Sequence, residues 1–345
     1  MILLVEVFYA GSHRQLITTL TQGLQLDERS CHLTTMSGRK WHWRARTSAL
    51  HLAEVIPRQQ FSVLFTSSVT PLAELCGLRP DLAAPHKVLY FHENQLVYPV
   101  RKRTDTDFQY GYNQITACLV ADEVVFNSGY NMESFLGNIN HFMKTQPDYR
   151  PKGLADKIRS KCRVLYFPLC LPGVALGARL GESAEDRPLH ILWPHRWEHD
   201  KNPALFFETM TQLHEEGLPF RLSVLGERCD EAPPEFERAQ RELKDHIENW
   251  GYLESKEDYW KVLRSADVVV STADHEFFGV AVLEAVASGC TPLCPSALVY
   301  PEWFEARHLF RTAGQLLRRL RQWCRRPGAA SASGRGSVVA VVSVM

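Results

Sequence analysis

Two glutamates that stand eight positions apart, Glu276 and Glu284, flank an apolar segment directly after the strand-like run "ADVVVSTA". A helix that begins near Phe278 would place Glu276 in the loop at its positive end, and Glu284 inside it, between one and two turns further on. The backbone N–H groups of the Phe278–Gly279–Val280 turn would then form an anion site. Acidic residues near helix starts are also common for dipole reasons alone, so a structural role for either glutamate stays open.

A basic pair lies in "WPHRWEHDKNP", which follows the first predicted strand in the second half of the chain. Arg196 can donate bidentate hydrogen bonds to a phosphate, and Lys201 can act as a point charge, so together they suit a diphosphate. The alternative is a solvated loop in which both cations pair with Glu198 and Asp200. Because this segment and the glutamate pair follow strands of the same predicted domain, we favour a common anion site.

Polar clusters also follow three predicted strands in the first half of the chain. They are Gly11–Ser12–His13, His92–Glu93–Asn94 and Asn127–Ser128. The glycine would let the backbone approach a ligand closely. Since parallel strands end at one edge of a sheet, the three clusters would face the same cleft. The structural alternatives are helix capping by Ser128 and a buried, hydrogen-bonded His92.

The composition is that of an ordinary globular protein of 345 residues, which is long enough for two domains. The hydrophobic fraction is 45%, the charged fraction is 23% and the formal net charge is zero, so wholesale charge-driven binding of nucleic acid is not expected. Nine cysteines without a CxxC pair favour a reducing compartment. We therefore expect a cytoplasmic protein, with the nucleus as a second location.

The sequence contains no complete metal-binding motif and no apolar segment long enough for a membrane helix. "HEFFG" and "HENQL" begin like the HExxH zinc motif but end in Gly279 and Leu96, so the second histidine ligand is missing. A magnesium site at Asp105–Asp107 would lack convergent oxygen ligands. No apolar run reaches the ~18 residues that a membrane helix needs. We expect no metal, no membrane contact and no obligate protein partner.

Short apolar runs rich in Val, Ile and Phe alternate with helical patterns, which is typical of α/β domains with parallel sheets. The runs are "ILLVEVF", "SVLFTSS", "KVLYFHE", "EVVFNS" and "RVLYFP", and then "LHILWPH", "RLSVLGE", "ADVVVST" and "CTPLCP". The Gly-rich segment 173–188 predicts a linker between domains at 1–172 and 189–326. The small-residue segment 327–345 has no helical periodicity, so we expect an irregular, disordered tail.

These features resemble a known family. Glu276 and Glu284, with Arg196 and Lys201, resemble the E-x7-E arrangement of retaining GT-B glycosyltransferases of the family 4 type. More narrowly, five segments look like the glycosyltransferase-like domain-containing protein 1 family, the tRNA-queuosine alpha-mannosyltransferases: "KWHWRARTSAL", "FHENQLVYPV", "FQYGYNQI", "WPHRWEHDK" and "HEFFGVAVLEAV". The resemblance spans residues 1–326. It implies a GT-B fold, with two doubly wound Rossmann-like domains facing across a cleft, the first binding the acceptor and the second the nucleotide sugar.

The resemblance also implies a reaction. Mannose would pass from GDP-mannose to queuosine at the anticodon wobble position of tRNA(Asp), giving mannosyl-queuosine with retained configuration. Arg196 and Lys201 would hold the diphosphate and stabilise charge on the leaving phosphate without a metal. Glu284 would bind the donor ribose and Glu276 the transferred sugar. His92 completes the implied catalytic group, and Gly11, Phe278, Gly279 and Val280 complete the implied donor site.

For the acceptor, the resemblance implies a surface of rings and cations, because unpaired bases stack on aromatic rings and Arg planes. Trp41, Trp43, Arg44 and Arg46 fit that description, and "RKR" at 101–103 adds charge. Half-buried packing is the alternative for the two tryptophans. The remaining acceptor-binding candidates are His13, Asn94 and Asn127.

Two other functions stay open. One is a GT-B glycosyltransferase with a protein, lipid or small-glycoside acceptor. The other is a non-catalytic, shortened isoform that only binds nucleotide sugar or tRNA. Product analysis after incubation with donor and tRNA separates them.

Overall fold

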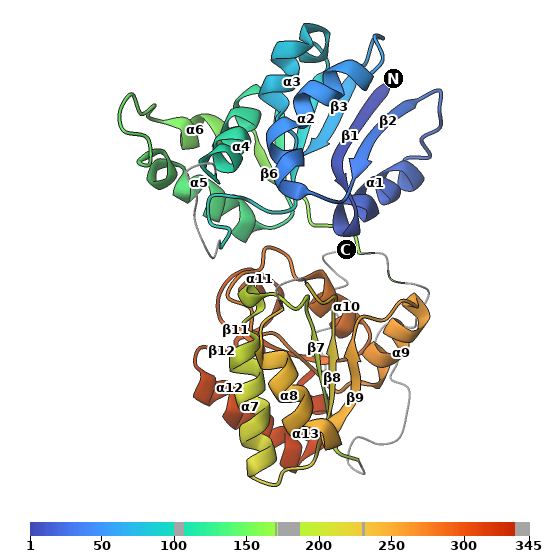
Figure 1. Cartoon of the computed structure of the whole chain (residues 1–345), viewed down its shortest axis with the longest axis vertical. Helices are drawn as coiled ribbons and strands as arrows, with labels where there is room; N and C mark the ends of the chain where they lie inside the picture. The colour runs from blue at the N-terminus through green and yellow to red at the C-terminus, as the bar shows by residue number, and fades with distance from the viewer. Residues whose placement is uncertain (100–106, 170, 172–186, 230–231, 335–345) are drawn as a thin grey trace. The chain divides into compact units, whose positions relative to one another are not determined.

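The computed structural model describes residues 1–99, 107–169, 171, 187–229 and 232–334. Most of the predicted linker, the basic run 101–103 and the last eleven residues, 335–345, lie outside this part of the chain. The chain forms two compact units, Met1–Pro168 and Leu169–Met345, so the division falls close to the predicted boundary at residue 172 (Figure 1). Each unit is an α/β domain with its own hydrophobic core.

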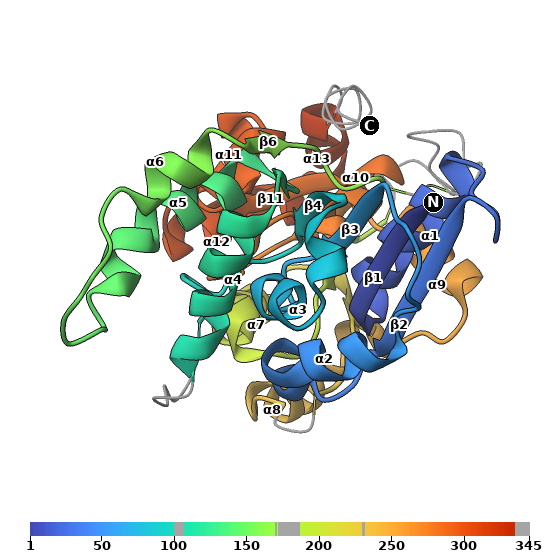
Figure 2. The same cartoon turned by 90° about the horizontal axis from the view of Figure 1, so that it is seen from above.

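The first unit contains a six-stranded, fully parallel sheet of order β2-β1-β3-β4-β5-β6. Its strands are β1 (Ile2–Tyr9), β2 (Cys31–Ser37), β3 (Val63–Ser67), β4 (His86–Phe91), β5 (Glu123–Phe126) and β6 (Cys162–Val164). Its helices are α1 (Gly11–Gly23), α2 (Trp41–Val55), α3 (Leu72–Leu78), α4 (Phe108–Val120), α5 (Gly129–Met143) and α6 (Leu154–Arg159). Parallel neighbours need crossover helices, and α2, α3 and α4 pack side by side (Figures 1 and 2).

The second unit repeats this plan with a parallel sheet of order β12-β11-β10-β7-β8-β9. Its strands are β7 (Leu189–Pro194), β8 (Phe220–Leu225), β9 (Ile247–Gly251), β10 (Val268–Val270), β11 (Thr291–Pro295) and β12 (Leu309–Phe310). Its helices are α7 (Pro203–Glu215), α8 (Glu235–Glu242), α9 (Lys256–Ser265), α10 (Val280–Ala287), α11 (Tyr300–Trp303), α12 (Ala313–Arg325) and α13 (Pro327–Gly334). Helix α7 packs against both α8 and α12 (Figure 1).

The prediction of two doubly wound α/β domains is confirmed, and all nine predicted strands are present. The sequence patterns missed β2, β9 and β12, and each of these is an outer or terminal strand of its sheet. In β2, half-buried and exposed positions alternate without a fully buried one. Such a strand lacks the continuous apolar run by which a central parallel strand is recognised.

The expectation of an irregular segment after Arg326 is wrong for residues 327–334. They form α13, which packs against α12 and β11. Ala330 is fully buried, and its carbonyl oxygen accepts a 2.8 Å hydrogen bond from the Thr291 hydroxyl. A small residue such as Ala330 allows α13 to approach β11 closely. This packing stabilises a helix that hydrophobic periodicity does not predict. The rest of the predicted tail lies outside the described residues.

The strand orders place a topological switch point in each sheet. In the first unit β1 lies between β2 and β3, and in the second unit β7 lies between β10 and β8. Ligands of open α/β sheets bind beyond the carboxyl ends of the strands at such points. The loops after β1 and β3, and those after β7 and β10, flank these points, and the loop after β4 lies one strand further along the first sheet. Among the described helices, none has the length and apolar character needed to cross a membrane.

Candidate active site

In the second unit, Lys201 and Glu276 meet at the switch point between β7 and β10. Lys201 ends the short 3-10 helix after β7, and its side chain is 9% exposed. Its ammonium group donates a 2.8 Å hydrogen bond to the His275 carbonyl oxygen and lies 3.4 Å from Glu276 Oε2 and 3.1 Å from Asp200 Oδ2. The structure thus brings together a cation and a carboxylate that the sequence places 75 residues apart.

Glu276 is held as a carboxylate. Burial alone would raise its pKa, but the Lys201 ammonium and further favourable interactions outweigh this and lower the pKa to about 2. Its Oε1 accepts hydrogen bonds from the backbone N–H groups of Phe277 and Phe278 at 3.2 and 3.4 Å. The group is therefore negatively charged and fixed in direction at neutral pH.

Helix α10 starts two residues later than the sequence predicts, and its N-terminus is uncapped. Gly279 is the N-cap residue with φ of +84°, a left-handed conformation that favours glycine. Within the described residues, no side chain caps this end, and the backbone N–H groups of Val280, Ala281 and Val282 form no hydrogen bond. Three donors and the positive end of the helix dipole are thus free for an anion.

Glu284 lies one turn inside α10, as predicted. Its Oε2 accepts a 2.8 Å hydrogen bond from the Tyr259 hydroxyl of α9, and burial raises the pKa of this carboxyl group. One oxygen is therefore engaged within the protein and the other remains for a ligand hydroxyl. Tyr259 orients this carboxylate and was not found from the sequence, because it lies 25 residues away on another helix.

Arg196 has a different environment from Lys201. Its side chain is 56% exposed, and its guanidinium lies 3.2 Å from Glu198 Oε1, which is the pairing that the solvated-loop alternative describes. An exposed arginine next to a buried lysine can reorient toward a bound anion. Its role in diphosphate binding stays a prediction.

His195 and Asp200 belong to this site; His195 was not selected from the sequence, and Asp200 was named only as a partner in the solvated-loop alternative. Both are buried, and His195 Nε2 has no hydrogen-bond partner within the described residues. Burial, then the Lys201 charge, lower the His195 pKa to about 3, so the ring is neutral. The loop is tightly packed, because a Cβ atom at Gly226 would lie 1.9 Å from the His195 carbonyl oxygen. The only sequence signal was their position beside Arg196 and Lys201.

In the first unit, His13 lies between two carboxylates at the carboxyl ends of β1 and β4. Its Nδ1 is 3.2 Å from Glu6 Oε2, and its Nε2 is 3.5 Å from Glu93 Oε2. The rings of His13 and His92 stack with their centroids 3.9 Å apart. The structure therefore brings two of the predicted site residues together and adds Glu6, a strand residue that the sequence analysis did not select.

These two histidines have opposite charge states. Burial alone would lower the pKa of His13, but Glu6 and Glu93 outweigh it and raise the pKa to about 10. Burial and the neighbouring His13 charge lower the pKa of His92, whose buried Nε2 has no hydrogen-bond partner within the described residues. An imidazolium held between carboxylates thus stands beside a neutral imidazole that can still bond to a ligand hydroxyl.

The same residues also form a possible metal-binding group. Ligand atoms of Glu6, His13 and His92 all lie within 4.8 Å of one another. A metal ion would require the His13 proton to leave, since only the neutral ring can coordinate. The carboxylates favour that proton strongly, and the ion pair already engages Glu6 and His13. We therefore keep the prediction that no metal is needed.

Asn94 and Asn127 are buried, and their amide groups bond to the chain itself. Asn94 Nδ2 donates to Asn131 Oδ1 at 2.9 Å and to the Ser134 hydroxyl at 3.0 Å. Asn127 Nδ2 donates to the His92 carbonyl oxygen at 2.7 Å. This network leaves the two asparagines little or no surface for an acceptor, and it fixes the backbone that carries His92. Ser128 caps α5, which is the structural alternative named for it.

The candidate acceptor residues of α2 separate into two pairs. Trp43 is 64% exposed, whereas Arg44 is half-buried and its guanidinium donates a 3.1 Å hydrogen bond to the Ser37 hydroxyl. Trp41 packs against the core with its ring centroid 4.9 Å from that of Tyr110, and the Arg46 guanidinium lies 4.5 Å from the same ring centroid. Trp43 is thus placed for an external ligand and Arg44 keeps part of its surface, whereas Trp41 and Arg46 pack against Tyr110. Gly11 begins α1 with φ of +48° and open space around its missing Cβ.

Comparison with known proteins places this geometry in context. The profile of the tRNA-queuosine alpha-mannosyltransferase N-terminal domain matches residues 1–169, and that of glycosyl transferases group 1 matches residues 181–315. The Drosophila melanogaster protein described as tRNA-queuosine alpha-mannosyltransferase is 50% identical over 332 residues, which cover 94% of this chain and 87% of the fly protein.

Solved structures agree on the fold. The chain is similar to the OtsA apo structure with a TM-score of 0.67 and 11% identity over 100% of this chain and 96% of that one. Sucrose-phosphate synthase from Thermosynechococcus elongatus gives a TM-score of 0.67 and 13% identity, covering 99% and 94%. A glycosyltransferase from Rickettsia africae gives 0.64 and 16%, covering 99% and 93%. At these identities the likeness supports the GT-B fold alone.

Proposed function

We propose, starting from the finding that the chain belongs to the tRNA-queuosine alpha-mannosyltransferase family, that it transfers mannose from GDP-mannose to queuosine in tRNA(Asp). As a family member it is a glycosyltransferase. The structural observation that carries the proposal is the buried Lys201–Glu276 pair beside the uncapped N-terminus of α10. A buried cation and three free N–H donors in one place are suited to a diphosphate leaving group.

The donor would lie at the carboxyl edge of the second sheet. Its diphosphate would accept hydrogen bonds from the N–H groups of Val280–Val282, and Arg196 would turn from Glu198 toward it. Lys201 would stabilise the charge that develops when the glycosidic bond breaks, at a site where burial strengthens the interaction. Glu276 would accept hydrogen bonds from mannose hydroxyls, and Glu284 from the ribose.

The first unit would supply groups for the reacting hydroxyl and the tRNA. His92 carries a neutral, unpartnered Nε2 at the end of β4, so it can accept or donate one hydrogen bond to a sugar or acceptor hydroxyl. Trp43 is exposed in the first turn of α2 and could stack on an unpaired base, with the half-buried Arg44 beside it. We propose that the protein meets its tRNA in the cytoplasm.

The test is mass spectrometry of nucleosides from tRNA incubated with the protein and GDP-mannose. We expect a queuosine product heavier by one hexose from tRNA that contains queuosine, and none from tRNA that lacks it. A Glu276→Gln variant serves as the matched control, because it keeps the size of the side chain and removes its charge. Absence of product from folded wild-type protein with both substrates would overturn the proposal.

Metal independence is part of the proposal. The positive charge comes from Lys201, Arg196 and the helix N-terminus, so transfer should continue at an unchanged rate after dialysis against a chelator. A loss of transfer that returns with Zn²⁺ or Mg²⁺ would instead point to a metal, with the Glu6–His13–His92 group as its first candidate site.

A further inference from the structure

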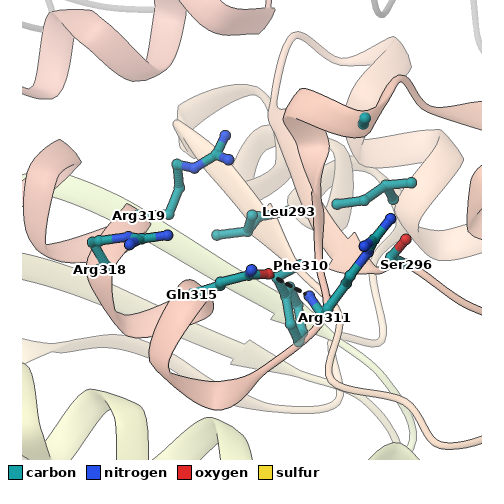
Figure 3. A pocket seen from close by; sticks show the side chains of 9 residues that line it. Leu293, Ser296, Phe310, Arg311, Gln315, Arg318 and Arg319 are labelled. Carbon is teal, nitrogen blue, oxygen red and sulfur yellow. Dashed lines mark hydrogen bonds between the residues drawn. The ribbon is translucent and has the colours of Figure 1, made fainter.

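A pocket of about 260 Å³ lies in the second unit, between the ends of β11 and β12 and the first half of α12. Three of its lining side chains are arginines: Arg311, directly after β12, and Arg318 and Arg319 on α12. Figure 3 shows Arg318 and Arg319 on one side of the pocket and Arg311 on the other. No acidic residue lines it. The pocket is thus a concave surface with a positive charge concentrated around it.

Two of these guanidinium groups are available. Within the described residues, the side chains of Arg311 and Arg318 form no ion pair or hydrogen bond, and both residues are exposed. Arg319 donates to the Arg307 carbonyl oxygen and lies 5.9 Å from the Trp323 ring centroid. Unpaired arginines that converge on one pocket repel each other, and an anion between them removes that repulsion.

The pocket also offers neutral donors. The Gln315 Oε1 accepts a 2.7 Å hydrogen bond from the Arg311 backbone N–H, which leaves the amide N–H groups of Gln315 free to donate. Ser296, which carries a hydroxyl group, also lines the pocket. Guanidinium forks together with amide and hydroxyl donors are the usual set for phosphate oxygens in nucleic-acid complexes. The volume is below the ~300–1,000 Å³ of drug-sized pockets, so it fits a phosphodiester with part of its sugar.

The position of the pocket favours a polyanion over a separate small ligand. Arg311 and Ser296 follow β12 and β11, and Glu276 follows β10, which is the next strand in the same parallel sheet. With neighbouring strands ~4.8 Å apart, the strand ends that carry the two sites are separated by only about 10 Å. An RNA chain whose target base reaches the transfer centre would carry phosphates over that distance.

We propose that Arg311 and Arg318, with Gln315 and Ser296, bind a backbone phosphate of the acceptor tRNA next to the transferred base. This inference rests on the proposed function, since it takes its ligand class from the tRNA acceptor. The contact is independent of base identity and sets the register of the tRNA on the second unit. It is separate from the donor site, which is built from the loops after β7 and β10.

The experiment compares Arg311→Gln/Arg318→Gln with Arg238→Gln/Arg241→Gln, a double variant that removes the same charge from helix α8. The dissociation constant for tRNA is measured between 50 and 200 mM salt, together with GDP affinity and melting temperature. For the pocket variant we expect weaker tRNA binding and a log–log salt slope lower by ~0.7–0.9 for each lost phosphate contact. GDP affinity and melting temperature should not change, and the α8 variant should bind tRNA like wild type.

The outcomes separate the two proposals. If wild type binds and mannosylates tRNA but the pocket variant keeps its salt slope, the phosphate site is wrong and the proposed function stands. If wild type neither binds nor modifies tRNA, the proposed function fails first. A third arm uses vesicles that contain phosphatidylserine: binding that depends on Arg311 and Arg318, with tRNA binding unchanged, would assign the pocket to a membrane surface and overturn our assignment.

Discussion

The charge of His13 depends on its two carboxylate neighbours. We expect His13→Gln to destabilise the protein by ~3–5 kcal/mol, because it leaves Glu6 and Glu93 buried without their cation. The folded pKa of about 10 exceeds the ordinary histidine pKa of 6.5, so the stabilisation is complete below pH 6.5 and is lost as the pH rises through about 10. Urea unfolding of variant and wild type across this range measures the difference.

A matched control for this prediction is His51→Gln, since His51 is an exposed histidine of α2. It should change stability by no more than ~0.5 kcal/mol. Equal stability of the His13 and His51 variants at pH 6 would mean that His13 is not charged in the folded protein.

Glu276 is expected to act through its charge. Glu276→Gln should reduce turnover ~100-fold or more and leave the fold intact, because Lys201 keeps Asp200 as a partner. Its folded pKa of about 2 is below 4.5, so its contribution to stability is present above pH 4.5 and lost as the pH falls toward 2. Acid unfolding of the variant should show less pH dependence in this window, and full activity of a folded variant would falsify the charge-based role.

At the scale of elements, the N-terminus of α10 depends on one backbone conformation. Gly279→Ala should cost ~1–2 kcal/mol, because alanine is strained at φ of +84°. An added Cβ would lie 3.5 Å or more from its neighbours, so strain rather than collision is the cause. GDP affinity should fall as well, since the free N–H groups would shift.

The control for α10 is Gly77→Ala in α3. A Cβ there meets open space and needs no positive φ, so the change should be neutral or stabilise the protein by up to ~1 kcal/mol. Thermal melts of both variants provide the comparison. If the Gly279 and Gly77 variants have the same melting temperature, the left-handed backbone conformation at Gly279 does not limit which residue can begin α10.

The first turn of α2 gives a second prediction for an element, because its two tryptophans differ in burial. Trp43→Ala should weaken tRNA binding by ~1–3 kcal/mol and leave the melting temperature unchanged, since the ring is 64% exposed. Trp41→Ala should cost about 2 kcal/mol of stability or more, because its ring packs on Tyr110. If instead Trp41→Ala weakened tRNA binding and Trp43→Ala lowered the melting temperature, Trp41 would be the tRNA contact and Trp43 the packing residue.

At the scale of the whole molecule, we expect the second unit to bind the donor nucleotide and the first unit to contribute to the transfer step. Lys201→Gln should abolish GDP binding, because Lys201 belongs to the anion site of the second unit. His92→Gln should leave GDP binding unchanged and reduce transfer, because His92 belongs to the first unit. Calorimetry with GDP and mass spectrometry of the product give the two readouts, and circular dichroism confirms folding. Loss of GDP binding in the His92 variant would contradict this division.

The sequence by itself determined the architecture and the segments of the candidate donor site. Apolar runs identify eight central strands and the edge strand β6, so nine strands and both α/β units could be predicted. In such sheets the loops after the strands carry the ligand sites, so Arg196, Lys201 and Glu276 could be selected from their places in the chain alone.

Only the tertiary structure decided which of these groups touch and which are accessible. Glu6 and Tyr259 joined the sites because packing brings different elements together, and their local sequence carries no sign of that contact. Trp41 and Trp43 stand two positions apart in one helix turn, yet one faces the core and the other faces solvent. Burial, and with it charge state and access to a ligand, is a property of the whole packed unit, and a residue's type and spacing do not contain it.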